Sequence, residues 1–140
     1  MTEIMNKSIY QKLLFFSLLI FLTVSATPLL AQQKAIKKVS IDETEKMAKE
    51  DPDNVILDVR TPGEIAEGHI EGAIFADYLG EDFVKKVEGL DKDKTYLMVC
   101  KVGGRASKAT QLMIDLGFPN VFVMEGGMDS WLKAGKPVVK

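Results

Sequence analysis

The chain has 140 residues with a formal net charge of −2; 46% of the residues are hydrophobic and 27% are charged, which suits one globular domain after an N-terminal segment. No basic stripe is interleaved with aromatic residues, so nothing in the sequence indicates a nucleic-acid partner. One cysteine and one histidine exclude an internal disulfide and are too few for a usual metal centre, so we expect no metal and no other cofactor.

The N-terminal segment has the pattern of a secretory signal peptide. Lys7 and Lys12 precede an apolar run over residues 13–24, and small residues follow it. A basic start, a short apolar centre and a small-residue cleavage site are the three parts of such a peptide. We therefore expect export to the periplasm or beyond the cell.

Two cleavage points fit this pattern, after Ala26 or after Ala31. Cleavage after Ala26 leaves almost no spacer behind the apolar run, so Ala31 is favoured. The predicted division is then a signal peptide over residues 1–31 and one domain over residues 32–140, with no stable membrane association after cleavage. The alternative is an uncleaved anchor, because residues 13–31 are uncharged over nearly the length of a membrane-spanning helix.

The first half of the domain begins with a short edge strand over residues 35–39. Ser40 and Glu43 have the spacing of a capping box and predict a helix that runs to about Glu50. A continuous apolar run follows at residues 55–59 and predicts a buried strand.

A second helix start follows that strand. Thr61, Pro62 and Glu64 suit the N-cap, first and third positions of a short helix that ends at Gly68. Residues 72–75 predict a second buried strand. Helical spacing of apolar residues over 81–90 predicts a further helix on the surface of the core.

In the second half, strands and helices continue to alternate. We expect a strand at 95–100, a helix at 105–116, a strand at 121–124 and a closing helix that contains Trp131, which with the methionines belongs to the core. Short apolar runs between helices predict an α/β fold with a mostly parallel central sheet and helices on both faces. Ligands of such sheets bind beyond the carboxyl ends of the strands, where Cys100 lies.

The segment after Cys100 has the composition of an anion-binding loop. Gly103 and Gly104 allow left-handed backbone and leave room for N–H groups to converge on one centre. Lys101 and Arg105 add positive charge, which favours a reactive thiolate at that centre. Arg105 has the wrong sign for a helix start, which pairing with a carboxylate or a bound anion would explain.

Two further interpretations of these residues stay open. Cys100 could be an ordinary buried cysteine at the end of a strand. His69 could be its catalytic base, although the flanking glycines favour a histidine that ties backbone groups in a turn.

Three motifs together resemble the rhodanese-like domains. They are ILDVRTPGEIAEGHIEGAI, with its Asp-x-Arg and Gly-His-Ile-x-Gly-Ala, the loop CKVGGRAS, and the ending EGGMDSWLKAGKPV. They occur in the family's order and span about residues 38–139. The resemblance implies a single rhodanese-like domain with thiosulfate sulfurtransferase activity.

The resemblance also implies a role for each site residue. Cys100 takes up a sulfane sulfur from a donor such as thiosulfate and passes it to a thiophilic acceptor, cyanide or a thiol. The substrate-binding residues are those of the loop, Lys101, Val102, Gly103, Gly104 and Arg105. Asp58 and Arg60 support the loop from below; we expect Asp58 to pair with Arg105 or with loop N–H groups, and Arg60 with Glu64 or a neighbour.

Two departures and two alternatives accompany this assignment. Val102 and Gly104 stand where the family usually has polar residues, which leaves fewer side-chain donors for thiosulfate. Related phosphatases have five residues between cysteine and arginine, whereas this chain has four, so phosphatase activity is disfavoured. The alternative function is a persulfide carrier or binding module that delivers sulfur to a protein partner, such as a thiol protein, with little turnover of small molecules.

Overall fold

A parallel sheet runs through the middle of the domain. The computed structural model describes residues 35–140, together with residue 11 alone, so the predicted signal peptide lies outside the described residues except at that position. Within them, five strands pair in the order β1-β5-β4-β2-β3, and every pair is parallel. The prediction of a parallel α/β sheet is confirmed. The strands are β1 (Lys37–Val39), β2 (Asn54–Asp58), β3 (Ile74–Phe75), β4 (Thr95–Val99) and β5 (Val121–Met124).

Two of the described helices begin where the capping signals in the sequence place them. Ser40 accepts a hydrogen bond from the N–H of Glu43 at 3.1 Å, and Thr61 and Glu64 form a complete capping box. Each cap binds N–H groups that the first helical turn cannot satisfy. Among the described residues, no helix is both long enough and apolar enough to cross a membrane. The helices are α2 (Ile41–Glu50), α3 (Pro62–Glu67), α4 (Phe83–Glu88), α5 (Gly104–Asp115) and α6 (Gly127–Lys133).

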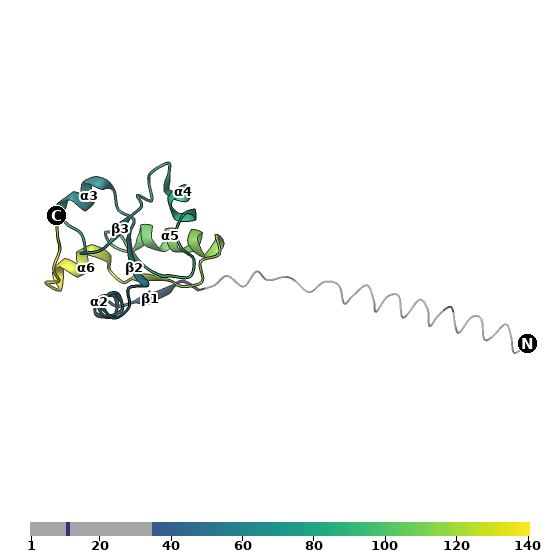
Figure 1. Cartoon of the computed structure of the whole chain (residues 1–140), viewed down its shortest axis with the longest axis horizontal. Coiled ribbons are helices and arrows are strands. Elements are labelled where there is room, and N and C mark those ends of the chain that lie inside the picture. The colour runs from purple at the N-terminus through teal and green to yellow at the C-terminus, as the bar shows by residue number, and fades with distance from the viewer. Residues whose placement is uncertain (1–10, 12–34) are drawn as a thin grey trace, which may run out of the picture. The chain divides into compact units, whose positions relative to one another are not determined.

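The helices cover both faces of the sheet, as predicted. Side chains of α4 and α5 pack with one face of the sheet, and those of α2 and α6 with the other face (Figure 1). Successive residues of β2 and β4 alternate between the two faces: Leu57 and Met98 belong to the α5 side, Ile56 and Leu97 to the α6 side. Trp131 is 2% exposed, so its predicted place in the core is confirmed.

One predicted element differs from the structure. Residues 72–75 were expected to form a buried strand, but β3 is a two-residue edge strand whose Ile74 and Phe75 are 37% and 43% exposed. β3 pairs with β2 and ends the sheet. An apolar run of this length does not tell a central strand from an edge strand, which explains the error.

Candidate active site

Cys100 follows the carboxyl end of β4, one of the inner strands. The register of the sheet sets Val99, the residue before it, beside Asp58 of β2. The cysteine side chain is 1% exposed and belongs to the core cluster on the α5 side. Only Lys101, Val102 and Gly103 separate Cys100 from the first residue of α5, so the thiol lies at the base of a tight strand-to-helix turn.

The sulfur atom accepts a hydrogen bond from the loop itself. The N–H of Gly103 donates to Cys100 Sγ at 3.0 Å. Gly103 has φ 104°, in the left-handed region, and an added Cβ would meet no other atom within 4 Å. Glycine is therefore required here by backbone conformation and not by crowding. The loop thus supplies the sulfur with a main-chain hydrogen-bond donor.

Further N–H groups of the loop are free to bind an anion. In the described part of the chain, the N–H groups of Lys101 and Val102 have no hydrogen-bond acceptor. The amides of the first turn of α5 have no partner within the helix, and the helix dipole makes that end positive. Main-chain donors therefore surround the turn that holds the sulfur, which is the composition of an anion cradle.

Arg105 does not reach across the loop, because Glu64 of α3 holds it. Its two terminal nitrogens donate to the two carboxylate oxygens of Glu64 at 2.7 and 2.6 Å. The Arg105 hydrogen bonds, with others from Thr61, lower the pKa of Glu64 to about 2, and Glu64 in turn raises the pKa of Arg105. The expectation that Arg105 anchors a carboxylate is confirmed. The two residues lie 41 positions apart in the sequence, so no sequence pattern links them. The only sequence signal for this pair was the helix-capping position of Glu64, which holds its carboxylate in place.

The partner expected for Asp58 needs a correction, whereas Arg60 contacts Glu64 and a neighbour as expected. Asp58, 1% exposed, pairs with Arg60 and not with Arg105 or loop N–H groups. Arg60, 6% exposed, also donates to the carbonyl oxygens of Glu64 and Gly68, at 3.2 and 2.9 Å. The two residues flank Val59 and lie at the same strand end, so they satisfy each other locally. This buried ion pair joins β2 to α3, through Glu64 and the C-cap residue Gly68.

A small hollow opens beside the loop, between α3 and α6. Its volume is about 120 Å³. Lys101 is exposed at its rim, and the next residue, Val102, is 63% exposed. The hollow is lined by Arg60, Glu64, Glu67, Gly68, Lys101, Met128, Asp129, Leu132 and Val138. An exposed lysine and an exposed valine are thus the side chains that the loop offers to an approaching molecule.

His69 contacts other parts of the fold. Its ring lies 3.4 Å from the carbonyl oxygen of Ile65 and edge-on to Phe75, and its main chain exchanges two hydrogen bonds with Val139. These contacts agree with a histidine that ties backbone segments together, and they give it no link to the Cys100 sulfur.

Comparison with known proteins agrees on one family. The family model described as "Rhodanese-like domain" matches residues 40–134. The candidate sulfurtransferase YtwF of Bacillus subtilis (strain 168) is 36% identical over 102 residues, which are 73% of this chain and 96% of that protein. Thiosulfate sulfurtransferase 16 of Arabidopsis thaliana is 35% identical and covers 58% of this chain and 76% of its own length. A tRNA uridine(34) hydroxylase of Pectobacterium carotovorum is 37% identical, but the chain spans only 28% of that protein.

Solved structures give the same result. A rhodanese-related protein from Thermoplasma volcanium superposes with a TM-score of 0.66 at 30% identity, over 74% of this chain and 97% of that one. The polysulfide-sulfur transferase homodimer from Wolinella succinogenes gives a TM-score of 0.63 at 30% identity, over 74% and 78% of the two chains.

Proposed function

Because the chain belongs to the rhodanese-like domain family, we propose that it is a sulfurtransferase that carries a sulfane sulfur on Cys100. Relatives named as sulfurtransferases support transferase chemistry. The observation that carries the proposal is the turn after β4, where the N–H of Gly103 donates to Cys100 Sγ and further amides lack partners. Such a turn stabilises both a thiolate and the anion that reacts with it.

The reaction has two displacement steps at sulfur. In the first, the Cys100 thiolate attacks the outer sulfur of thiosulfate; a new S–S bond forms, the S–S bond of the donor breaks, and its electron pair leaves with sulfite. In the second, cyanide or a thiolate attacks the outer sulfur of the persulfide, and the electron pair of that S–S bond returns to Cys100. The products are thiocyanate, or a persulfide of the acceptor thiol, and the free enzyme.

The loop residues divide this work between main chain and side chain. The amides from Lys101 to Arg105 bind the outer sulfur, which carries negative charge in thiosulfate and again in the persulfide. Gly103 and Gly104 keep side chains away from that sulfur. The guanidinium group of Arg105 is bound by Glu64, so Arg105 helps to hold the loop and does not bind the donor. Lys101 is the exposed cation that attracts an anionic donor.

A second candidate is a persulfide carrier that hands its sulfur to a protein thiol. Two observations favour it. Arg105 is neutralised by Glu64, which leaves less charge for a dianion such as thiosulfate, and Val102 presents an exposed apolar side chain on the same loop as Cys100. In both candidates the sulfur resides on Cys100, and they differ in the molecule that approaches it.

A donor and acceptor panel separates the two candidates. Purified protein is incubated with thiosulfate or polysulfide, and with cyanide or a small thiol as acceptor. A thiosulfate sulfurtransferase produces thiocyanate with repeated turnover, whereas a carrier accumulates one persulfide per chain and turns over slowly. Cys100→Ser abolishes both signals. If neither donor yields thiocyanate or persulfide in the wild type, the proposal fails.

We also propose that residues 1–31 direct export and are removed. The proposal rests on the basic, apolar and small-residue order of that segment. N-terminal sequencing of the protein recovered from a periplasmic extract would begin at residue 32. Recovery of the intact chain from membranes would show an uncleaved anchor instead.

A further inference from the structure

The start of α6 holds the main chain of the Cys100 loop. The N–H of Met128 donates to the carbonyl oxygen of Cys100 at 2.8 Å, and the N–H of Asp129 donates to that of Lys101 at 3.0 Å. These two amides belong to the first turn of α6 and have no acceptor within their own helix. The contact thus pairs unsatisfied groups of a helix with two successive carbonyls of the loop.

Gly127 makes this approach possible. A Cβ added at Gly127 would overlap the carbonyl oxygen of Cys100 and would lie 2.5 Å from that of Lys101, both main-chain atoms that cannot turn away. The residue also has φ 59°, in the left-handed region. Position 127 therefore excludes a side chain for two reasons: its left-handed backbone conformation and the close approach of the loop carbonyls.

The two hydrogen bonds also fix which way the loop amides point. In a trans peptide the C=O and N–H groups point in opposite directions, and no described peptide bond is cis. The carbonyls of Cys100 and Lys101 point toward α6, so the N–H groups of the same two peptides, on Lys101 and Val102, point away from it. These are the loop amides without an acceptor in the described chain.

We propose that Gly127 is a positioning residue for sulfur transfer, which rests on the function proposed above. By letting α6 bind the carbonyls of Cys100 and Lys101, it turns the amides of Lys101 and Val102 outward as donors for the anion that reacts at Cys100. A side chain at position 127 pushes the loop from α6 and frees these peptides to rotate. The thiol then remains, but the oriented donors are lost.

The test compares two alkylating reagents of nearly equal size. Iodoacetate is an anion and iodoacetamide is neutral, and both react with the thiolate, so the ratio of their rate constants at Cys100 cancels the thiolate fraction. Oriented amides favour the anion. We expect the ratio for the wild-type protein to exceed that of glutathione by about tenfold, which is less than the roughly hundred- to thousandfold effect of a single oxyanion-binding donor on catalysis.

Gly127→Ala is compared with Gly135→Ala as the matched control. Gly135 has φ 69° and open space around an added Cβ, so this variant introduces the same backbone strain away from the loop. We expect Gly127→Ala to reduce the ratio to that of glutathione and to slow persulfide formation by about tenfold or more. Gly135→Ala should keep the wild-type ratio and rate. Both variants are first checked for a cooperative unfolding transition.

A second pair of variants decides the question if Gly127→Ala does not fold. Asp129→Pro removes the N–H that binds the Lys101 carbonyl, at a first-turn position where proline costs no intrahelical hydrogen bond. Asp129→Ala changes the same exposed side chain and keeps the N–H. We expect only the proline variant to lower the ratio.

The outcomes separate this inference from the proposed function. A wild-type ratio equal to that of glutathione overturns the inference, as does an unchanged ratio in folded Gly127→Ala or in Asp129→Pro. If the ratios behave as expected but no donor forms a persulfide, Gly127 still orients the loop amides toward an anion, and the sulfurtransferase proposal fails.

Discussion

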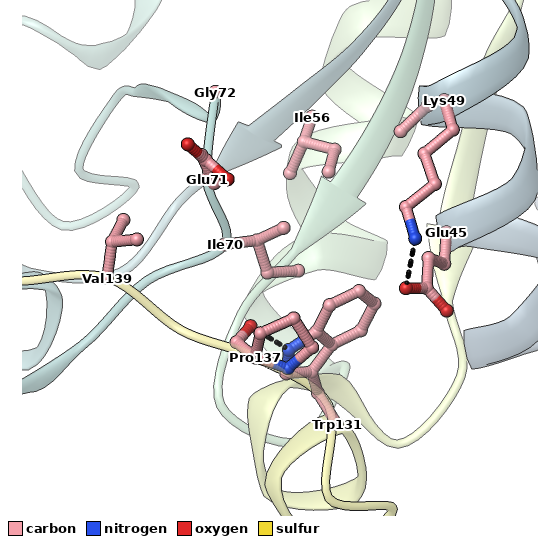
Figure 2. A pocket seen from close by; sticks show the side chains of 10 residues that line it. Glu45, Lys49, Ile56, Ile70, Glu71, Gly72, Trp131, Pro137 and Val139 are labelled. Carbon is pink, nitrogen blue, oxygen red and sulfur yellow. Dashed lines mark hydrogen bonds and ion pairs between the residues drawn. The ribbon is translucent and has the colours of Figure 1, made fainter.

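The Cys100 loop and the pocket beneath α2 are built differently: main-chain groups form the first, and side chains form the second. The loop presents main-chain N–H groups around a buried sulfur, with two exposed side chains at its rim. The pocket, of about 220 Å³, is walled by side chains: Ile56, Ile70 and Trp131 line its interior, and the Glu45–Lys49 ion pair stands at one side (Figure 2).

The comparison shows where each hollow is sensitive to substitution. Backbone conformation and glycines shape the loop, so changes there should affect chemistry. Apolar volume shapes the pocket, so truncation there should affect stability alone. α6 contributes to both, with its first turn on the loop carbonyls and Trp131 in the pocket.

The largest loss of stability is expected from Asp58→Ala. This variant leaves the Arg60 guanidinium buried without its carboxylate, and breaking a buried ion pair from one side costs about 3–5 kcal/mol. Urea unfolding measures the loss. Asp53→Ala is the control, because the Asp53–Lys94 pair is at the surface and should contribute less than about 1 kcal/mol. Equal losses in the two variants would contradict the structural role of the buried pair.

In the pocket, Ile70→Ala should reduce stability without affecting chemistry. Ile70 is 6% exposed, and its truncation should cost about 2–3 kcal/mol of unfolding free energy. Persulfide formation should stay within about twofold of the wild-type rate, since the variant leaves the loop amides in place. Ile74→Ala on the exposed edge strand is the control and should cost less. A tenfold slower reaction in Ile70→Ala would show that the pocket also affects the chemistry at Cys100, which contradicts this prediction.

In the loop, Gly103→Ala should show the opposite pattern. The added methyl group meets no neighbour, so the cost is the strain of a left-handed alanine, about 1–2 kcal/mol. Relief of that strain rotates the N–H that donates to Cys100 Sγ, and persulfide formation should fall about tenfold or more. Gly135→Ala also places an alanine at positive φ, away from the loop, and should react normally. A normal rate in Gly103→Ala would show that the Gly103 N–H does not contribute to persulfide formation.

The smallest effect is the pH dependence of the Glu64–Arg105 pair. Arg105 lowers the pKa of Glu64 in the folded state from 4.5 to about 2, so the folded protein holds the ionised form more strongly than the unfolded chain does. The stabilisation is therefore complete above pH 4.5 and is lost as the pH falls toward 2. Unfolding of the wild type and of Glu64→Gln is compared across this range. The difference in stability should shrink below pH 4.5; a constant difference would contradict the pairing.

Much of the fold could be predicted from local signals. The capping residues at Ser40 and Thr61 identify helix starts, and apolar runs of four to five residues identify the central strands. The order of the strands could not be predicted, because the pattern of apolar residues carries no information on which strands become neighbours. The exposure of β3 was missed for the same reason.

The site was predictable in composition but not in its pairings. Cys100, the two glycines and Arg105 are contiguous, and their chemistry follows from the sequence. The Glu64–Arg105 and Asp58–Arg60 pairs depend on how α3 is set against the strand ends. The role of Gly127 could not be predicted, since a Gly-Gly pair does not reveal that the first turn of α6 approaches the loop.

The most direct test of the central claim is intact-mass measurement of the protein after treatment with a sulfur donor and removal of excess reagent. We predict that the wild-type chain gains the mass of one sulfur atom, that cyanide removes it, and that fragmentation assigns it to Cys100. Cys100→Ser should gain nothing. A wild-type chain of unchanged mass with both thiosulfate and polysulfide would contradict the account.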